Sequence, residues 1–165
     1  MPGGRSSRRS EADGPPRPSP AAGSRGPPGA IVRVRVLALD YGSARCGCAI
    51  SDPTGTIVTP IEPVVQPGSR RGLARLRTLA REREAQLVLV GLPLGLDGAD
   101  TAQTRETRAF AERLAGRLGE EIPVQLHDER FTTRIAQRLS GDSRAAEDSR
   151  AAAHLLEDWL ATGSR

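Results

Sequence analysis

Alternating apolar positions predict three short strands at the start of the apolar part of the chain. Residues 34–39 alternate and then become continuously apolar, as a strand does where it enters a core. Residues 46–51 and 57–65 also have strand-like composition, and turn-forming residues separate the three segments. Pro60 and Pro63 cannot donate a backbone N–H, so we expect the third strand at an edge of the sheet. Together the three segments predict an antiparallel meander.

Further along, the apolar period lengthens, which predicts helices that alternate with strands. Apolar residues recur every three or four positions in residues 73–80 and 110–118, as on one face of a helix. Residues 87–90 form an uninterrupted apolar run, which is typical of a strand covered on both faces. Residues 122–126 predict a fifth strand, and a last helix is expected over about 148–161.

Local signals place the ends of these helices. Asp100 with Gln103 predicts a capping box at the start of the second helix, and Gly119 predicts its end. A further short helix is expected after Thr132 and Thr133.

The order of elements defines the fold class and the domains. Three strands followed by alternating helices and strands predict an α/β fold, in which helices pack on a mixed five-stranded sheet. Residues 1–29 are rich in Gly, Pro, Ser and Arg, have almost nothing to bury, and are expected to form a disordered tail. Residues 30–165 are expected to form one domain, because a hydrophobic content of 37% in 165 residues suffices for a single core.

Charge is weak evidence for a nucleic-acid partner. The chain has a net charge of +4, but five arginines against two acids in residues 1–29 supply +3 of it. The predicted domain is therefore nearly balanced, at +1. Cys46 and Cys48 lie two residues apart in a predicted strand and are expected to point the same way into the core. The chain has no apolar run of membrane-spanning length and no secretory signal pattern, so we expect a reducing, cytoplasmic setting without membrane contact.

Acidic residues stand at positions where an acid is structurally inconvenient. Asp40 ends the first apolar strand, and Asp128 with Glu129 ends the fifth, so both sites fall where open α/β sheets place their ligand crevice. Asp148 lies on the apolar stripe of the last helix.

Each acid also has a structural alternative. Asp40 could form an Asx turn, Asp148 could be a helix N-cap, and Asp128 and Glu129 could be solvated loop charges. Carboxylates that converge at one end of a sheet would repel one another unless a cation lay among them. Mg²⁺ takes oxygen ligands, and two such ions about 4 Å apart support phosphodiester cleavage.

Four motifs in order resemble those of the YqgF/RuvX family. They are LALDYGSARCGCAISD (37–52), VGLPLGLDG (90–98), HDERFTT (127–133) and DSRAAAHLLEDWL (148–160). They span about residues 35–162. The chain departs from the family in a shorter stretch between Arg130 and Asp148, and in Cys46 and Cys48, which replace aliphatic residues.

The resemblance implies an RNase H-like fold related to Holliday junction resolvases, and a nuclease that matures the 5′ end of pre-16S rRNA on a ribosomal precursor particle. Branched DNA is the substrate proposed for some relatives. The implied ligands of Mg²⁺ (or Mn²⁺), as two ions, are Asp40, Asp148 and either Glu129 or Asp128, of which we favour Glu129 for its longer reach. The implied contacts to the substrate are those of Arg45, Arg130 and Thr132.

Other functions remain open at this point. The chain could be an assembly factor that binds nucleic acid and cleaves little, or a Holliday junction resolvase-like DNA nuclease. Its oligomeric state, monomer or homodimer, stays open. A phosphotransferase of the actin-like and sugar-kinase type has a similar phosphate loop to residues 40–43, but it needs two such domains.

Overall fold

The computed structural model describes residues 34–129 and 144–163. Its strands are β1 (Val36–Tyr41), β2 (Arg45–Ser51), β3 (Val58–Val65), β4 (Leu87–Leu92) and β5 (Val124–Asp128), and its helices are α1 (Arg70–Glu82), α2 (Ala102–Leu118) and α3 (Arg144–Gly163). Among these helices, none is long and apolar enough to cross a membrane. The predicted tail over 1–29 and the short helix after Thr133 lie outside the described residues.

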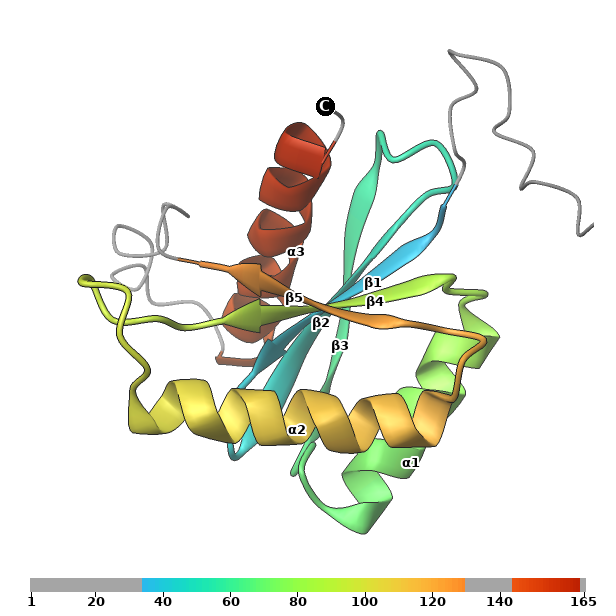
Figure 1. Cartoon of the computed structure of the whole chain (residues 1–165). Coiled ribbons are helices and arrows are strands. Elements are labelled where there is room, and N and C mark those ends of the chain that lie inside the picture. Colours follow the sequence, from blue (N-terminus) through green and yellow to red (C-terminus); the bar gives the residue numbers. More distant parts are fainter. Residues whose placement is uncertain (1–33, 130–143, 164–165) are drawn as a thin grey trace, which may run out of the picture. The chain divides into compact units, whose positions relative to one another are not determined.

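The five strands form one mixed sheet in the order β3-β2-β1-β4-β5 (Figure 1). The meander is antiparallel, since β1 pairs with β2 and β2 with β3 in opposite directions. The later strands are parallel, with β4 beside β1 and β5 beside β4. The predicted fold class is therefore confirmed, and β3 lies at an edge as its two prolines predicted.

Helices cover both faces of the sheet: α1 and α2 lie on one side and α3 on the other (Figure 1). Strand side chains alternate between these faces. Leu37 and Leu39 belong to the larger core beneath α1 and α2, whereas Val36 and Ala38 pack beneath α3. Cys46 and Cys48 are both buried in the larger core, as their spacing predicted.

The start of α2 differs from the prediction by one residue. Its N-cap is Thr101, whose side chain accepts the N–H of Thr104, while the Thr104 hydroxyl accepts the N–H of Thr101. The predicted pair of Asp100 and Gln103 is therefore wrong, although the box motif itself is present. Asp100 instead pairs with Arg108 at 3.3 Å. At the other end, Gly119 stops the helix with a φ of 73°, which confirms its predicted role.

Candidate active site

Asp40 lies near the end of β1, on the face of the sheet that α3 covers. It has the parity of Ala38, which packs beneath that helix, and the opposite parity to Leu39. Asp40 pairs with Gly47 in the antiparallel ladder and is therefore a strand residue, not part of the turn that follows.

Glycines on the strands flanking β1 leave space beside Asp40. A Cβ built on Gly47 of β2 would lie 1.9 Å from the backbone oxygen of Asp148. A Cβ on Gly91 of β4 would lie 1.7 Å from Oε1 of Glu129. Non-bonded atoms cannot approach so closely, so a Cβ at Gly47 would displace the backbone of α3, and a Cβ at Gly91 would displace the carboxylate of Glu129. The two glycines thus admit the backbone of α3 and a carboxylate to the sheet next to Asp40.

Asp148 is the fifth residue of α3, because the helix begins at Arg144. The alternative in which Asp148 is the N-cap is therefore wrong. The next residue anchors this part of the helix, since the Ser149 hydroxyl donates to the backbone oxygen of Ile61 in β3 at 2.6 Å. Further along α3, Asp158 lies 2.9 Å from Nε2 of His127 in β5. These two contacts tie the helix to the two edge strands of the sheet, β3 and β5.

Strand parity separates the two acids at the end of β5. Val124 and Leu126 pack with the core beneath α1 and α2, and Asp128 has the same parity. Glu129 follows the strand with the opposite parity, and its N–H donates to the carbonyl of Leu92 at 3.2 Å. Glu129 lines the same pocket as Asp40, whereas Asp128 does not. The carboxylate oxygen Oε1 of Glu129 is fully buried.

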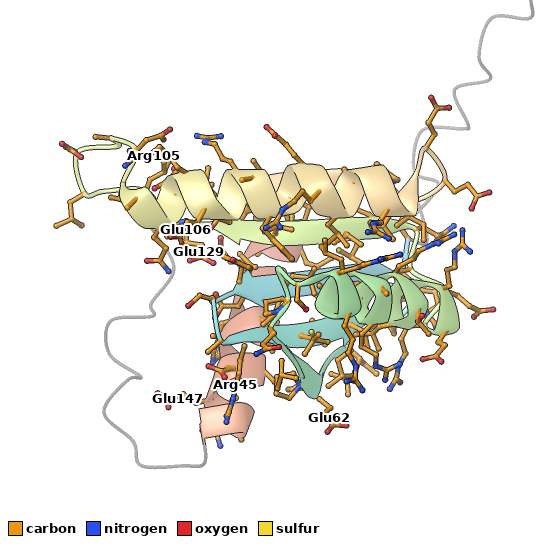
Figure 2. The ribbon with its side chains drawn as sticks, turned by 90° about the horizontal axis from the view of Figure 1, so that it is seen from below. Arg45, Glu62, Arg105, Glu106, Glu129 and Glu147 are labelled. Atoms are coloured by element: carbon orange, nitrogen blue, oxygen red, sulfur yellow. The ribbon has the colours of Figure 1, made fainter. Side chains whose placement is uncertain are left out.

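A single pocket of about 220 Å³ collects three of the predicted acids. Its lining residues are Asp40, Tyr41, Gly42, Arg45, Gly91, Pro93, Gln103, Glu129 and Asp148. Figure 2 shows Glu129 at the same end of the sheet as Arg45. The acids come from β1, the end of β5 and α3, so segments more than a hundred residues apart meet here. We call this cavity the acid pocket.

Negative charge of the acid pocket acts on a neighbouring buried thiol. Hydrogen bonding to Cys48 and burial raise the pKa of the Cys46 thiol, and the carboxylates of Asp40 and Asp148 raise it further. Two acids from distant segments thus act on one buried thiol. Among the described residues, Arg45 is the one arginine that lines the pocket. A cation in the pocket would relieve the repulsion between the carboxylates.

The donor set fits a hard divalent ion. Three carboxylates offer oxygen ligands, and Mg²⁺ characteristically takes a few such ligands and keeps several waters. Over the described ranges 34–129 and 144–163, no three His, Cys, Asp or Glu side chains already form a compact ligand group. The three carboxylates line one pocket, and they would have to turn toward one another to share an ion.

Some site residues fall outside what the structure describes, and others were not foreseen. The predicted substrate contacts Arg130 and Thr132 lie in the undescribed segment 130–143. Gln103, in the first turn of α2, and Tyr41 line the pocket although the sequence reasoning did not single them out. The signal for Gln103 was its position just after the GLPLGLDG loop, at the start of a helix.

Comparison with solved structures identifies the class of protein. The chain superposes on Thermus thermophilus RuvC in complex with a Holliday junction substrate, with a TM-score of 0.51, over 79% of this chain and 96% of that one. The sequences are 14% identical, so this similarity concerns the fold alone. The sheet order and this match define an RNase H-like fold.

Sequence comparison identifies the family. Residues 34–162 match the family described as "RuvX: Holliday junction resolvase". Proteins named "Putative pre-16S rRNA nuclease" are 41% identical in Mycobacterium leprae, over 78% of this chain and 73% of that one, and 39% identical in Koribacter versatilis, over 68% and 72%. The chain belongs to the RuvX family. The predicted family and the enzyme class that it implies, a hydrolase of phosphodiester bonds, are confirmed.

Proposed function

We propose that this chain is a divalent-metal-dependent nuclease that processes the 5′ end of pre-16S rRNA on a ribosomal precursor particle in the cytoplasm. The observation that carries the proposal is the convergence of Asp40, Glu129 and Asp148 on one small pocket. The names of its relatives in Mycobacterium leprae and Koribacter versatilis support the choice of substrate.

The three carboxylates would hold Mg²⁺ (or Mn²⁺), as two ions. Such ions would supply activation of a water and charge stabilisation at the leaving oxygen of the phosphodiester. Arg45 would bind a non-bridging oxygen of the phosphate, for which the planar guanidinium is suited. Arg130 and Thr132 are proposed as further substrate contacts. Of the two acids at the end of β5, we assign the metal ligand to Glu129 and not to Asp128, because Glu129 lines the acid pocket and Asp128 does not.

The decisive experiment compares the wild type with Asp40→Asn and Asp148→Asn. Each protein is tested with Mg²⁺ and with Mn²⁺ on a pre-16S rRNA fragment, on linear DNA and on a four-way junction. Loss of a metal ligand is expected to lower the rate at least about a hundredfold. Glu147→Gln is the matched control, because it removes a neighbouring charge on α3 that does not line the pocket. If both Asn variants cut as fast as the wild type, the assignment is wrong.

Paired variants test the choice between the acids that follow His127. Glu129→Gln is expected to lose activity and to weaken Mn²⁺ binding in calorimetry. Asp128→Asn is expected to retain both. The reverse result would move the ligand to Asp128 and contradict the parity argument.

Junction resolution is the second candidate, favoured by the description of the matching family. Symmetric cuts of a four-way junction need two sites and therefore a dimer, whereas an rRNA nuclease can act as a monomer. Preferential cutting of the junction by a dimeric protein would support this alternative. Binding to pre-16S rRNA without cleavage of any substrate would instead indicate an assembly factor.

A further inference from the structure

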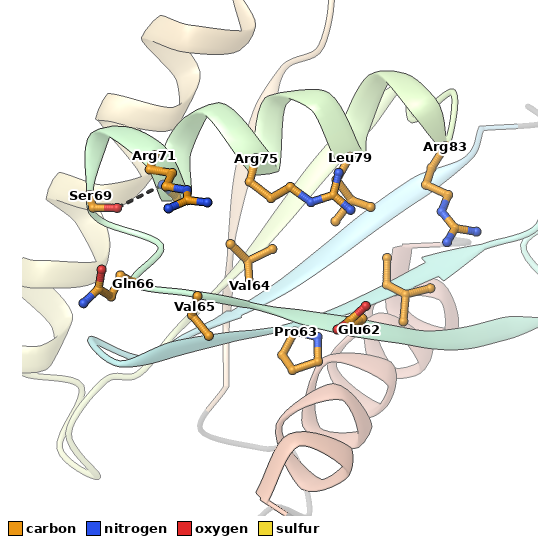
Figure 3. Close-up of a pocket in the computed structure, with 12 residues that line it drawn as sticks. Glu62, Pro63, Val64, Val65, Gln66, Ser69, Arg71, Arg75, Leu79 and Arg83 are labelled. Carbon is orange, nitrogen blue, oxygen red and sulfur yellow. Dashed lines mark hydrogen bonds between the residues drawn. The ribbon is translucent and has the colours of Figure 1, made fainter.

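A second cavity, of about 480 Å³, lies between helix α1 and the edge strand β3 (Figure 3). Arg71, Arg75 and Arg83 line it from the helix side. Its apolar lining includes Val64 and Leu79. We call this cavity the arginine groove.

The arginines of the groove follow the axis of α1. Arg71 and Arg75 are one turn apart, and Arg83 lies about 18 Å from Arg71 at the rise of an α-helix. Arg75 pairs with Glu82 at 3.5 Å, with both side chains more than half exposed, so this ion pair holds the guanidinium only weakly. The lining also includes one acid, Glu62, so the three arginines leave it with an excess of positive charge. The groove therefore favours an extended anion.

One residue pair of the β2–β3 ladder links the lining of the acid pocket to the lining of the arginine groove. Arg45, which lines the acid pocket, pairs with Val65 in the β2–β3 ladder. Next to this pair, the N–H of Gln66 donates to the carbonyl of Ala44 at 2.9 Å. Val65 and Gln66 both line the arginine groove. A ligand that leaves the acid pocket past Arg45 would cross the end of β3, from the α3 side of the sheet to the α1 side, before it enters the groove.

A peptide strand is a poor occupant of this edge. Pro60 and Pro63 lie within β3 and offer no N–H, so this strand is a poor template for the hydrogen-bond ladder that makes strand addition favourable. An anionic backbone needs no such ladder, because arginines contact phosphates through side chains alone. Apolar surface beside a row of cations suits the sugars and bases of a single strand.

We propose that the arginine groove binds single-stranded nucleic acid that continues from the cleaved bond, through phosphate contacts of Arg71, Arg75 and Arg83. This inference rests on the proposed nuclease function, since it extends the substrate path from the acid pocket. The proposed contacts are to phosphates, which every nucleotide carries, so they are independent of sequence.

Two double variants on the same helix test the groove. Arg71→Ala/Arg75→Ala removes one turn of groove arginines, and Arg77→Ala/Arg81→Ala removes an equally spaced pair that does not line the groove. Each pair includes one arginine in an exposed ion pair, with Glu82 or with Glu121, so the controls match. Binding of full-length protein to a 20-nucleotide and a 6-nucleotide single-stranded RNA is measured against salt concentration.

The groove variant is expected to bind the 20-nucleotide RNA about tenfold more weakly than the wild type, with a salt slope reduced by about 1.4 for two lost contacts. The control variant is expected to retain both values. The 6-nucleotide RNA is expected to lose less affinity, and Arg83→Ala to matter only for the longer RNA. Equal affinities of the two double variants, or tighter binding of a polyglutamate peptide than of RNA, would overturn the proposal.

This readout is separate from catalysis. If the wild type cuts nothing but the groove variant still loses RNA affinity, the nuclease proposal fails and the groove assignment stands. If the wild type cuts RNA and the groove variant binds and cuts the 20-nucleotide RNA equally well, the groove assignment fails alone.

Discussion

The two faces of the sheet are built from the same strands but are packed in different ways. On the face beneath α1 and α2, large side chains continue to the end of β1, where Tyr41 stacks on Phe110 with ring centroids 4.4 Å apart. On the α3 face, Val36 and Ala38 give way to Asp40, with Gly47 and Gly91 beside it. Side-chain volume is thus removed from one face where the acids gather.

The difference separates stability from chemistry within a single sheet. Buried apolar area on the α1 and α2 face stabilises the fold, at about 25 cal/mol per Å². On the α3 face, Gly47 has no Cβ and lets the backbone of α3 approach the sheet, and Gly91 leaves room for the carboxylate of Glu129. Charged groups therefore lie where apolar side chains would otherwise pack. A substitution that adds volume should therefore affect the two faces differently.

Gly47→Ala is expected to have the largest effect. The new Cβ would overlap a backbone atom of α3, the carbonyl oxygen of Asp148, and backbone cannot rotate away as a side chain can. The whole start of the helix must move, so we expect a loss of about 3 kcal/mol of unfolding free energy and loss of nuclease activity. Urea denaturation and RNA cleavage measure the two effects.

Gly116→Ala provides the matched control. A Cβ at Gly116 in α2 would meet nothing within 4 Å, so the same change should stabilise the protein by about 0.5–1 kcal/mol. Activity should not change. If Gly47→Ala proves as harmless as Gly116→Ala, the close contact of α3 with β2 is not present in solution.

Gly91→Ala should lower nuclease activity much more than it lowers stability. Its Cβ would meet the end of a flexible side chain, the carboxylate of Glu129, which can turn out of the pocket. We expect a cost of about 1 kcal/mol in stability, because Leu155 must also adjust, but a fall of about ten- to a hundredfold in activity and in Mn²⁺ affinity. Calorimetry with Mn²⁺ and cleavage assays test this. Full activity would exclude a role for Glu129.

The sequence predicted features that depend on local pattern. Strand periodicity, the edge position of β3 and the stop at Gly119 each follow from a few adjacent residues, and each is confirmed. The choice between Asp128 and Glu129 depends on how β5 pairs with β4, which no local pattern determines. The role of Gly47 was hidden for a similar reason, because the atom that fills its space belongs to a residue a hundred positions later.

The helix starts also show that a local pattern can fit two structures equally well. Asp148 satisfied the pattern of an N-cap as well as that of a buried stripe, and only the start of α3 at Arg144 separates the two. The capping box was misplaced because Asp100 and Thr101 are both good caps, and the hydrogen bonds of Thr104 decide between them.

The smallest effect on stability is expected at Asp52. The acids of the pocket come from distant segments, whereas the carboxylate of Asp52 has hydrogen-bond partners from its own turn. Its carboxylate accepts the N–H groups of Thr54, Thr56 and Ile57 and the Thr54 hydroxyl, and these hydrogen bonds hold its pKa well below the usual range. A lowered folded-state pKa stabilises the fold above the unfolded-state pKa of about 3.9 and stops doing so as pH falls.

Asp52→Asn should therefore lower the urea midpoint slightly at pH 7, and the gap to the wild type should narrow at pH 3. Mg²⁺ should leave this gap unchanged, because the carboxylate is already satisfied by backbone donors that a cation would have to displace. The acids of the α3 face differ, since their charges face one another across a pocket. A gap of equal size at both pH values would show that the turn does not distinguish the carboxylate from an amide.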